Sequence, residues 1–415
     1  MKSYVITIDE VDDVTEAVAC LQKELSHHGL PQNLRKNSIG IVTAHASSVY
    51  SGVCKAICDA LPFETAGIAV DSQNANGEIG IYLITIMILT CDECHFVASR
   101  TKNIKNIMNS APLIEECFLK LKSKLSALPD APESKLCLMY APVCAERYPG
   151  EYLEAISNID TEIPVFGSVS VDVERLTSES EKGVITIHNG EFFSDSVVML
   201  LLAGESVSPK FHITSFNKNA IIMQNIGRIT KCEQNLLYEI NNKPVIDFLY
   251  EIGFLNAETK SKIRDSYSGY KLDTGSLTSS FILNYGSEIN ISRSYSEFTA
   301  NGALVCLGYI QEGASISIAV SSPDSITETA CELLDKIQCS TNDEQDSTVL
   351  MYSCLGRRLG LLNKPTAEFE LIRDKLSKSS MNYVVSHVGG EICPVKLGQN
   401  WLNCEHNQTL IVCVL

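Results

Sequence analysis

Apolar and polar positions follow one arrangement that occurs three times along this chain. In each copy an apolar strand runs into a polar loop, a helix follows, and a second apolar strand ends close to a glycine. The copies cover residues 38–89, 135–204 and 348–392. Such units predict an α/β scaffold, in which parallel strands end at one rim and functional side chains stand on the loops of that rim.

The stretch between the second and third copies has a different pattern. Residues 278–320 alternate between apolar and polar positions with glycine turns between them, which predicts antiparallel strands. We therefore predict an α/β protein of repeated strand–loop–helix–strand units in two related halves, the second carrying an inserted antiparallel, strand-rich segment. The predicted parts are residues 1–205, and residues 206–415 with strands at 210–320, a helix at 324–339 and an α/β unit at 348–415.

Composition narrows the class of protein. The 415 residues include 33 basic and 50 acidic side chains, for a net charge of −17, which disfavours nucleic acids and anionic membranes as partners. The longest apolar run, residues 79–89, has about half the length that spans a bilayer. The first residues have the pattern of a strand rather than of a signal peptide, so the sixteen cysteines predict thiols in a reducing cytoplasm. We expect a cytoplasmic protein without membrane insertion.

The third copy carries the densest group of functional side chains. Its strands end in Ser353-Cys-Leu-Gly-Arg-Arg358 and Ser386-His-Val-Gly-Gly-Glu-Ile392, and parallel strands would bring both segments to one rim. The candidate ligand-binding residues there are Cys354, Arg357, Arg358, Gly390 and Glu391. They suit a small ligand with a carboxylate and an amine, with arginine as a planar clamp and Glu391 as the counter-charge. The alternative is that Arg357 and Glu391 pair with each other across the loops.

The triplet Gly-Glu-Ile around Glu391 is repeated in the first copy. It occurs there at residues 77–79. This echo supports the repeat and indicates a structural turn, so it argues against a catalytic role for Glu391.

The motifs that could bind zinc or haem are weak evidence for either group. Residues 91–95, Cys-Asp-Glu-Cys-His, have the spacing of covalent haem attachment, but attachment requires export, so two buried or loop cysteines are favoured. A zinc site would need Cys54 and Cys58 as a second pair, and their spacing matches no common zinc pattern. Non-covalent haem would need an axial histidine, for which His45 and His387 are best placed. Histidines at strand ends are usually structural, so we expect no cofactor and keep haem as the alternative.

Catalytic motifs are sparse. A cysteine-dependent hydrolase would use Cys354 as nucleophile and His387 as base, but no orienting Asn or Asp is evident beside them. The chain has no phosphate-binding loop, GxGxxG fingerprint, GxSxG elbow or HExxH helix. The sequence therefore favours a binding protein over an enzyme.

A set of short motifs carries a resemblance to a known family. They are Ala66-Gly-Ile-Ala-Val-Asp71, Asn76-Gly-Glu-Ile79, Pro164-Val-Phe-Gly-Ser168, Arg293 before Asn301-Gly-Ala-Leu304, Ile310-Gln-Glu-Gly-Ala-Ser315, residues 354–358 and Gly389-Gly-Glu-Ile-Cys-Pro394. In this order, over roughly residues 38–415, the chain resembles FIST-domain proteins with N- and C-terminal parts. The resemblance implies an intracellular sensory module that binds small ligands such as amino acids. Some members bind haem and respond to nitric oxide.

The resemblance also implies partners and a site. Family members are often fused to, or encoded beside, kinases, cyclase-type domains or chemotaxis receptors, and this chain shows no output domain. Its implied ligand-site residues are Arg293, Cys354, Arg357 and Glu391. We predict a sensor that binds a small polar, amino-acid-like metabolite and passes the signal to a separate partner. The alternatives are a haem-based nitric oxide sensor and, third, a cysteine-dependent hydrolase.

Overall fold

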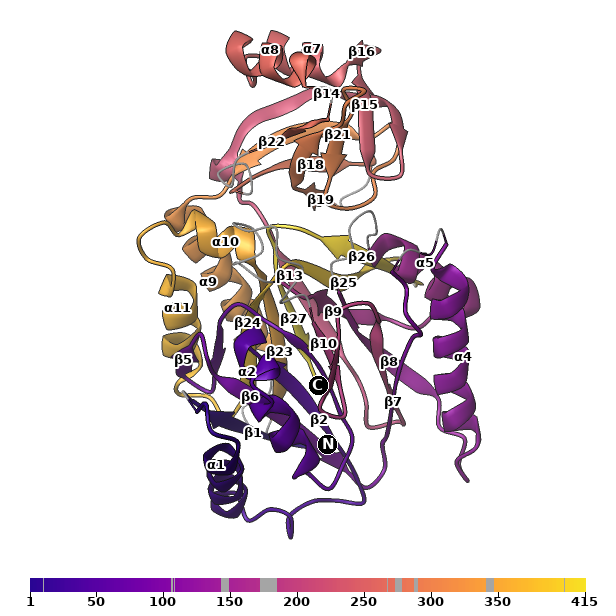
Figure 1. Cartoon of the computed structure of the whole chain (residues 1–415), viewed down its shortest axis with the longest axis vertical. Coiled ribbons are helices and arrows are strands. Elements are labelled where there is room, and N and C mark those ends of the chain that lie inside the picture. The colour runs from indigo at the N-terminus through magenta and orange to yellow at the C-terminus, as the bar shows by residue number, and fades with distance from the viewer. Residues whose placement is uncertain are drawn as a thin grey trace.

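A strand-rich lobe stands on one end of a larger α/β base, and both ends of the chain lie in the base (Figure 1). The computed structural model describes residues 1–9, 11–105, 107, 109–142, 149–171, 185–266, 268–272, 278–286, 290–340, 347–398 and 400–415. Within these residues no helix combines the length and the apolar character needed to cross a membrane.

Three six-stranded sheets form the base. Sheet A has the order β1 (Lys2–Ile8), β6 (Ile84–Cys91), β2 (Asn37–Ala44), β3 (Thr65–Ala69), β10 (Thr186–His188) and β11 (Glu191–Phe193). Sheet B has the order β13 (Lys210–Thr214), β27 (Leu410–Val414), β23 (Thr348–Cys354), β24 (Asn382–Val388), β4 (Gln73–Ala75) and β5 (Glu78–Gly80). Sheet C has the order β7 (His95–Arg100), β12 (Val198–Ala203), β8 (Ser134–Ala141), β9 (Val165–Val169), β25 (Gly390–Leu397) and β26 (Asn400–His406).

The three sheets share one plan. Four strands come from one stretch of chain, and the central pairs β2–β3, β8–β9 and β23–β24 are parallel. A hairpin from another stretch completes each sheet: β10–β11 in sheet A, β4–β5 in sheet B and β25–β26 in sheet C. The predicted α/β class and the parallel pairing of β23 with β24 are confirmed. The strand order divides the base into three units rather than two halves. Hairpin β4–β5 completes sheet B and hairpin β25–β26 completes sheet C, so these two exchanged hairpins cross the predicted boundary at residue 205.

Two of these hairpins turn through an Asn-Gly pair. Asn76 and Gly77 turn β4 into β5 with φ angles of 49° and 99°, and Asn189 and Gly190 turn β10 into β11 with 51° and 73°. Asn-Gly is favoured in two-residue turns because both residues tolerate positive φ. Glu391 instead lies inside β25. The Gly-Glu-Ile echo therefore does not mark equivalent positions, and the prediction based on it is wrong.

Helices cover the outer faces of the sheets, and the inner faces share one core. The helices are α1 (Val14–His27), α2 (Ala46–Tyr50) and α3 (Val53–Asp59) on sheet A, α4 (Ala111–Ser126) and α5 (Pro149–Ile159) on sheet C, and α9 (Pro323–Ser340), α10 (Leu355–Gly360) and α11 (Ala367–Leu376) on sheet B. A single apolar cluster draws on all three inner faces. Within it the Tyr352 hydroxyl donates to that of Tyr140 at 3.1 Å.

The lobe is an antiparallel insertion with a core of its own. It contains a 3-10 turn η1 (Lys218–Ala220), strands β14 (Ile221–Glu233), β15 (Leu236–Ile240), β16 (Lys243–Pro244), β17 (Tyr270–Lys271), β18 (Ser279–Asn284), β19 (Asn290–Arg293), β20 (Tyr295–Phe298), β21 (Leu304–Cys306) and β22 (Ser315–Val320), and helices α7 (Val245–Glu251) and α8 (Ala257–Asp265). The chain enters and leaves side by side, because Ile221 pairs with Ala319. The predicted strand-rich insertion is confirmed from β14 onward, whereas residues 210–214 form β13 of sheet B.

Candidate functional site

A buried polar segment lies where the lobe meets the base, and it runs from the last two residues of β26 to the start of β27. It consists of residues 405–409, Glu-His-Asn-Gln-Thr, and each is 5% exposed or less. We call this segment the polar turn. Buried polar groups need hydrogen-bond partners, and these residues find them on different elements. His406 Nε2 lies 3.1 Å from the carbonyl oxygen of Cys393, and Gln408 accepts from the Ser321 hydroxyl at 2.8 Å.

Arg293, the last residue of β19, approaches the polar turn from the lobe. Its Nη1 donates to the carbonyl oxygen of Glu405 at 2.8 Å, and its Nε donates to that of Tyr309 at 2.9 Å. The backbone N–H of Ser294 donates to Oδ1 of Asn407 at 3.1 Å. These bonds fix the lobe against the base.

The side chains of Arg293 and Glu405 border one glycine without pairing with each other. A Cβ atom at Gly308 would lie 2.9 Å from Nε of Arg293 and 3.1 Å from Cδ of Glu405. The Glu405 carboxylate accepts from the backbone N–H of Gly150, in α5, at 3.2 Å. Burial raises the pKa of Glu405 to about 7, although Arg293 acts to lower it. Among the described residues neither side chain forms an ion pair, so the guanidinium and the carboxyl group each keep capacity for a partner.

Glu391, in β25, holds the other end of the polar turn. Its Oε2 accepts from the backbone N–H and the hydroxyl of Thr409 at 3.2 and 2.7 Å. Burial raises the pKa of Glu391 to about 8, and burial together with this carboxylate raises the pKa of the Cys354 thiol well above its usual value. Oε1 of Glu391 and the hydroxyl of its cross-strand neighbour Ser168 have no hydrogen-bond partner within the described part of the chain.

Arg357 lies on the opposite, outer face of sheet B. Its Nη2 and Nε donate to Oε1 of Glu368 at 2.6 and 3.0 Å, and Nη2 also donates to the carbonyl oxygen of Ile326 at 3.1 Å. The Ser353 hydroxyl donates to Oε2 of Glu368 at 2.6 Å. Both charged side chains are fully buried. The ion pair of Arg357 is with Glu368, so the alternative pairing with Glu391 is wrong.

A chain of polar contacts continues on this outer face. Arg358 Nη1 lies 3.0 Å from Oδ2 of Asp71, to which the Ser72 hydroxyl donates at 2.9 Å. The same hydroxyl lies 2.8 Å from Nδ1 of His387, whose Nε2 lies 3.8 Å from Oε2 of Glu368. Asp71 and Ser72 lead into β4, so these contacts join the first unit of the base to the third.

The candidate residues from the sequence therefore divide between two faces. Successive side chains of a strand point to opposite faces, so Ser353 and Cys354 at the end of β23 diverge. The residues beside the polar turn are Cys354, Gly390, Glu391 and, on the lobe side, Arg293, whereas Arg357 and Arg358 lie on the outer face.

The same alternation separates Cys354 from His387. His387 pairs across the strands with Ser353 and stacks on Phe369 with ring centroids 4.1 Å apart, whereas Cys354 faces Glu391. A cysteine nucleophile needs an adjacent base or a lowered pKa. The nucleophile–base pair required by the hydrolase alternative is therefore not formed.

The two histidines considered for haem are engaged in the protein. His387 is fully buried against Phe369, with Nδ1 at 2.8 Å from the Ser72 hydroxyl. His45 caps α2, because its Nδ1 accepts from the backbone N–H of Ser47 at 3.3 Å. Haem ligation through Nε2 of His45 would place a proton on Nδ1 and break this cap. Nδ1 of His45 also lies 2.7 Å from the Ser47 hydroxyl.

Sequence analysis missed Glu368 and the polar turn, for different reasons. Glu368 occupies the same stripe of α11 as Ile372 and Leu376, four and eight residues later, and all three are buried. A carboxylate inside an apolar stripe was a usable signal. Residues 405–409 offered none, because five consecutive polar residues normally indicate an exposed loop.

Because its pKa is raised, Glu391 makes the free energy of unfolding depend on pH. Between pH 5 and pH 8 the folded protein keeps a proton that the unfolded chain, with an ordinary carboxyl pKa of about 4.3, has lost. The free energy of unfolding should therefore fall as pH rises, by up to about 1.4 kcal/mol per pH unit for this group. Glu391→Gln is expected to remove this contribution and so flatten the slope in urea unfolding at pH 5, 6, 7 and 8; the part due to Glu405 should remain.

Glu312→Gln, at an exposed position in the lobe, is the control and should keep the wild-type slope. An unchanged slope in Glu391→Gln would show that Glu391 titrates in its ordinary range.

Two family models match the chain. A model described as the FIST N domain matches residues 38–243, and a model described as the FIST C domain matches residues 266–394. Together they cover most of the chain, and the gap between the two ranges, residues 244–265, lies inside the lobe. No curated protein matches the chain.

Proposed function

Because the chain belongs to the FIST family, whose domains are known as sensory domains of signal transduction proteins, we propose that it binds a small polar metabolite at the polar turn. The metabolite is amino-acid-like, and the signal passes to a separate partner protein. The protein works in the cytoplasm, and the proposal includes no cofactor.

One observation carries the ligand chemistry: the guanidinium of Arg293 and the carboxyl group of Glu405 lie beside Gly308 without forming an ion pair. A zwitterion supplies the partner that each lacks, since its carboxylate suits a guanidinium and its ammonium suits a carboxylate. The ionised form of Glu405 would be favoured by a bound ammonium, because an opposite charge lowers a carboxyl pKa.

The location supports a sensory role. The polar turn is contacted by the lobe through Arg293 and Ser294 and by the base through Glu391. A ligand at the polar turn would contact both the lobe and the base. It would bias the position of the lobe, whose entry and exit strands lie side by side. The partner that responds to this position would be a kinase, a cyclase-type protein or a chemotaxis component, as the family resemblance implies.

Arg293→Ala is expected to weaken ligand binding about 10- to 100-fold, because a charge-assisted hydrogen bond contributes about 1.5–3 kcal/mol. The ligand is first selected by thermal shift of the whole protein with each of the twenty amino acids, and its affinity is then measured by calorimetry. The matching amine without a carboxylate, and the matching acid without an amino group, should both bind weakly.

Two further variants separate binding from folding. Glu405→Gln keeps the side-chain shape but removes the charge, and it should weaken binding similarly. Arg228→Ala removes an exposed lobe arginine that donates to the Gly313 carbonyl, and it should bind like the wild type. Wild-type affinity in both Arg293→Ala and Glu405→Gln, or the absence of any amino-acid ligand, would overturn the proposal.

A further inference from the structure

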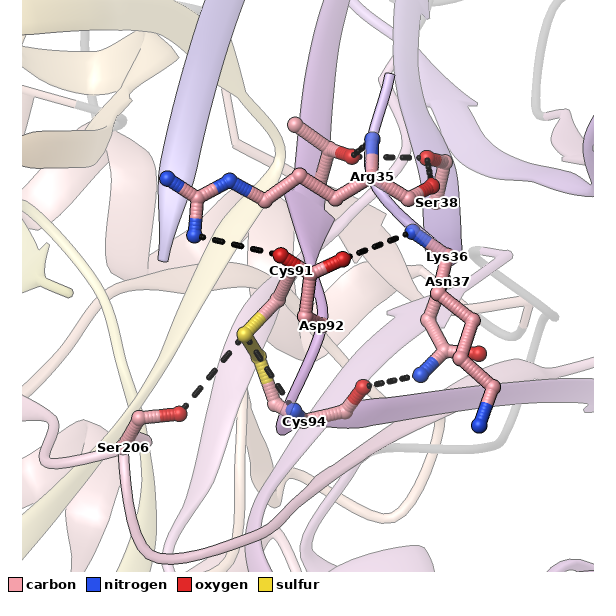
Figure 2. The surroundings of a disulfide bond; sticks show 9 residues. Arg35, Lys36, Asn37, Ser38, Cys91, Asp92, Cys94 and Ser206 are labelled. Atoms are coloured by element: carbon pink, nitrogen blue, oxygen red, sulfur yellow. Dashed lines mark hydrogen bonds and ion pairs between the residues drawn. A yellow bond between two sulfur atoms is a disulfide. The ribbon is translucent and has the colours of Figure 1, made fainter.

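A disulfide closes the connection between sheet A and sheet C. Cys91 is the last residue of β6, Cys94 immediately precedes β7, and their Cα atoms are 5.6 Å apart (Figure 2). Both cysteines are buried, whereas Asp92 and Glu93 between them are exposed. The bond therefore lies just beneath a surface turn. Its sulfur atoms are committed to each other, so the zinc and covalent-haem interpretations of this motif do not apply to the bonded form.

This pair differs from the other cysteines. The twelve other cysteines with described side chains are free thiols, as expected from the sequence, although Cys54 and Cys58 also lie one helical turn apart. A disulfide stabilises a protein mainly by closing a long loop of the unfolded chain, and this one closes only four residues. The folded protein therefore depends little on this bond, and its opening need not unfold the chain.

Polar groups around Sγ favour Cys91 over Cys94 as the reactive cysteine. The backbone N–H of Cys94 donates to Sγ of Cys91 at 3.2 Å, and the Ser206 hydroxyl lies 3.7 Å from the same sulfur (Figure 2). Hydrogen bonds to a sulfur favour its thiolate form. After reduction, Cys91 is the better placed of the two to act as the attacking thiolate.

The disulfide turn also positions one wall of a pocket. Asp92 accepts from the backbone N–H of Lys36 at 3.1 Å and lies 3.7 Å from Nη1 of Arg35. The Asn37 side chain donates to the carbonyl oxygen of Cys94 at 2.8 Å. Arg35, Lys36 and Asn37 line an open pocket of about 420 Å³, together with residues 62–64 and Phe96. The conformation of the turn and the shape of the pocket are thus linked by direct hydrogen bonds.

We propose that Cys91 and Cys94 form a reversible thiol–disulfide site whose redox state sets the shape of this pocket. The site is separate from the polar turn, so the inference stands independently of the proposed function. The co-reactants are low-molecular-weight thiols and their disulfides. This accounts for the disulfide at Cys91 and Cys94 beside twelve other described cysteines that are reduced.

The exchange is balanced in two steps. A small thiolate attacks one sulfur, which forms a mixed disulfide, breaks the Cys91–Cys94 bond and releases one protein thiolate that takes up a proton. A second small thiolate attacks the mixed disulfide, releases the second protein thiolate and leaves as the oxidised small disulfide. Two electrons pass from two small thiols to the protein, and oxidation by the small disulfide reverses both steps, with Cys91 attacking first.

The test is a redox titration of the whole protein with reduced and oxidised glutathione. Samples are alkylated and analysed by peptide mass spectrometry, and hydrogen exchange is followed in the peptide that covers residues 34–39. Cys91 and Cys94 are expected to change from fully bonded in excess oxidised glutathione to fully alkylated in excess reduced glutathione. Reduction should speed exchange in residues 34–39 at least tenfold, because the bonds to Asp92 and Cys94 loosen.

Two variants serve as references. The double variant Cys91→Ser with Cys94→Ser should show the fast exchange of the reduced protein in both buffers. Cys54→Ser should titrate like the wild type. The inference is overturned if the wild-type pair stays reduced in excess oxidised glutathione, if it stays bonded in excess reduced glutathione, or if exchange in residues 34–39 is the same in both states.

Discussion

Arg357→Ala is expected to lower the free energy of unfolding by about 3–5 kcal/mol, because it leaves a buried carboxylate without its counter-charge. Arg357 and Glu368 are fully buried, and two hydrogen bonds join them. Burial alone would raise the pKa of Glu368, but Arg357 and His387 outweigh it and lower this pKa to about 2. Glu368 therefore stabilises the fold above pH 4.5, and this stabilisation is lost as pH falls towards 2.

Chemical unfolding at neutral pH measures the effect. Arg373→Ala, which removes a partly exposed arginine of α11 that pairs with Asp374, is the matched control and should change stability by less than about 1 kcal/mol. The double variant Arg357→Met with Glu368→Leu should recover much of the loss, because it leaves no buried charge. A loss in Arg357→Ala no larger than in Arg373→Ala would contradict the structural role of this pair.

Residues 1–205 expressed alone are expected not to fold cooperatively. In the whole protein sheet C is completed by β25–β26, hairpin β4–β5 pairs with β24, and the inner core draws on all three sheets. The fragment would expose this core and leave the edge of β9 unpaired. Near-UV circular dichroism and dye binding should show a poorly packed chain, and co-expression with residues 206–415 should restore the native signal.

The lobe provides the contrasting control. Its core contains only lobe residues, and its first and last strands pair at Ile221 and Ala319. Joining residue 220 to residue 321 through a short glycine–serine linker should therefore leave the base folded. A well-packed fragment of residues 1–205 would show that the exchanged hairpins are dispensable.

The strand–helix–strand pattern predicted the α/β class and the parallel pairing of β23 with β24, because these depend on local apolar spacing. The hairpin exchange could not be predicted, since β4 has only three residues and its partner β24 begins more than 300 residues later. Local propensity carries no information about pairing at that separation.

The candidate site could likewise be predicted from the sequence only in part. Placing Cys354 and Glu391 together was possible because Cys354 ends β23 and Glu391 comes soon after the parallel strand β24. The strand period of two could also have separated Cys354 from His387. The partner of Arg357 is Glu368 because α11 packs on the outer face of sheet B, and helix packing is a tertiary property. The burial of residues 405–409 depends in the same way on the lobe that covers them.

The exchanged hairpin β4–β5 has a consequence for synthesis on the ribosome. Ser72, at its start, contacts His387, which lies 315 residues later in the sequence. At about 5–20 residues per second, roughly 15–60 s pass between the appearance of the two segments. During that interval the nascent chain carries an unpaired strand edge and an incomplete inner core. Chaperones should therefore bind mainly to nascent chains that have not yet reached residue 388. Slower translation near the end of the message should prolong this chaperone binding.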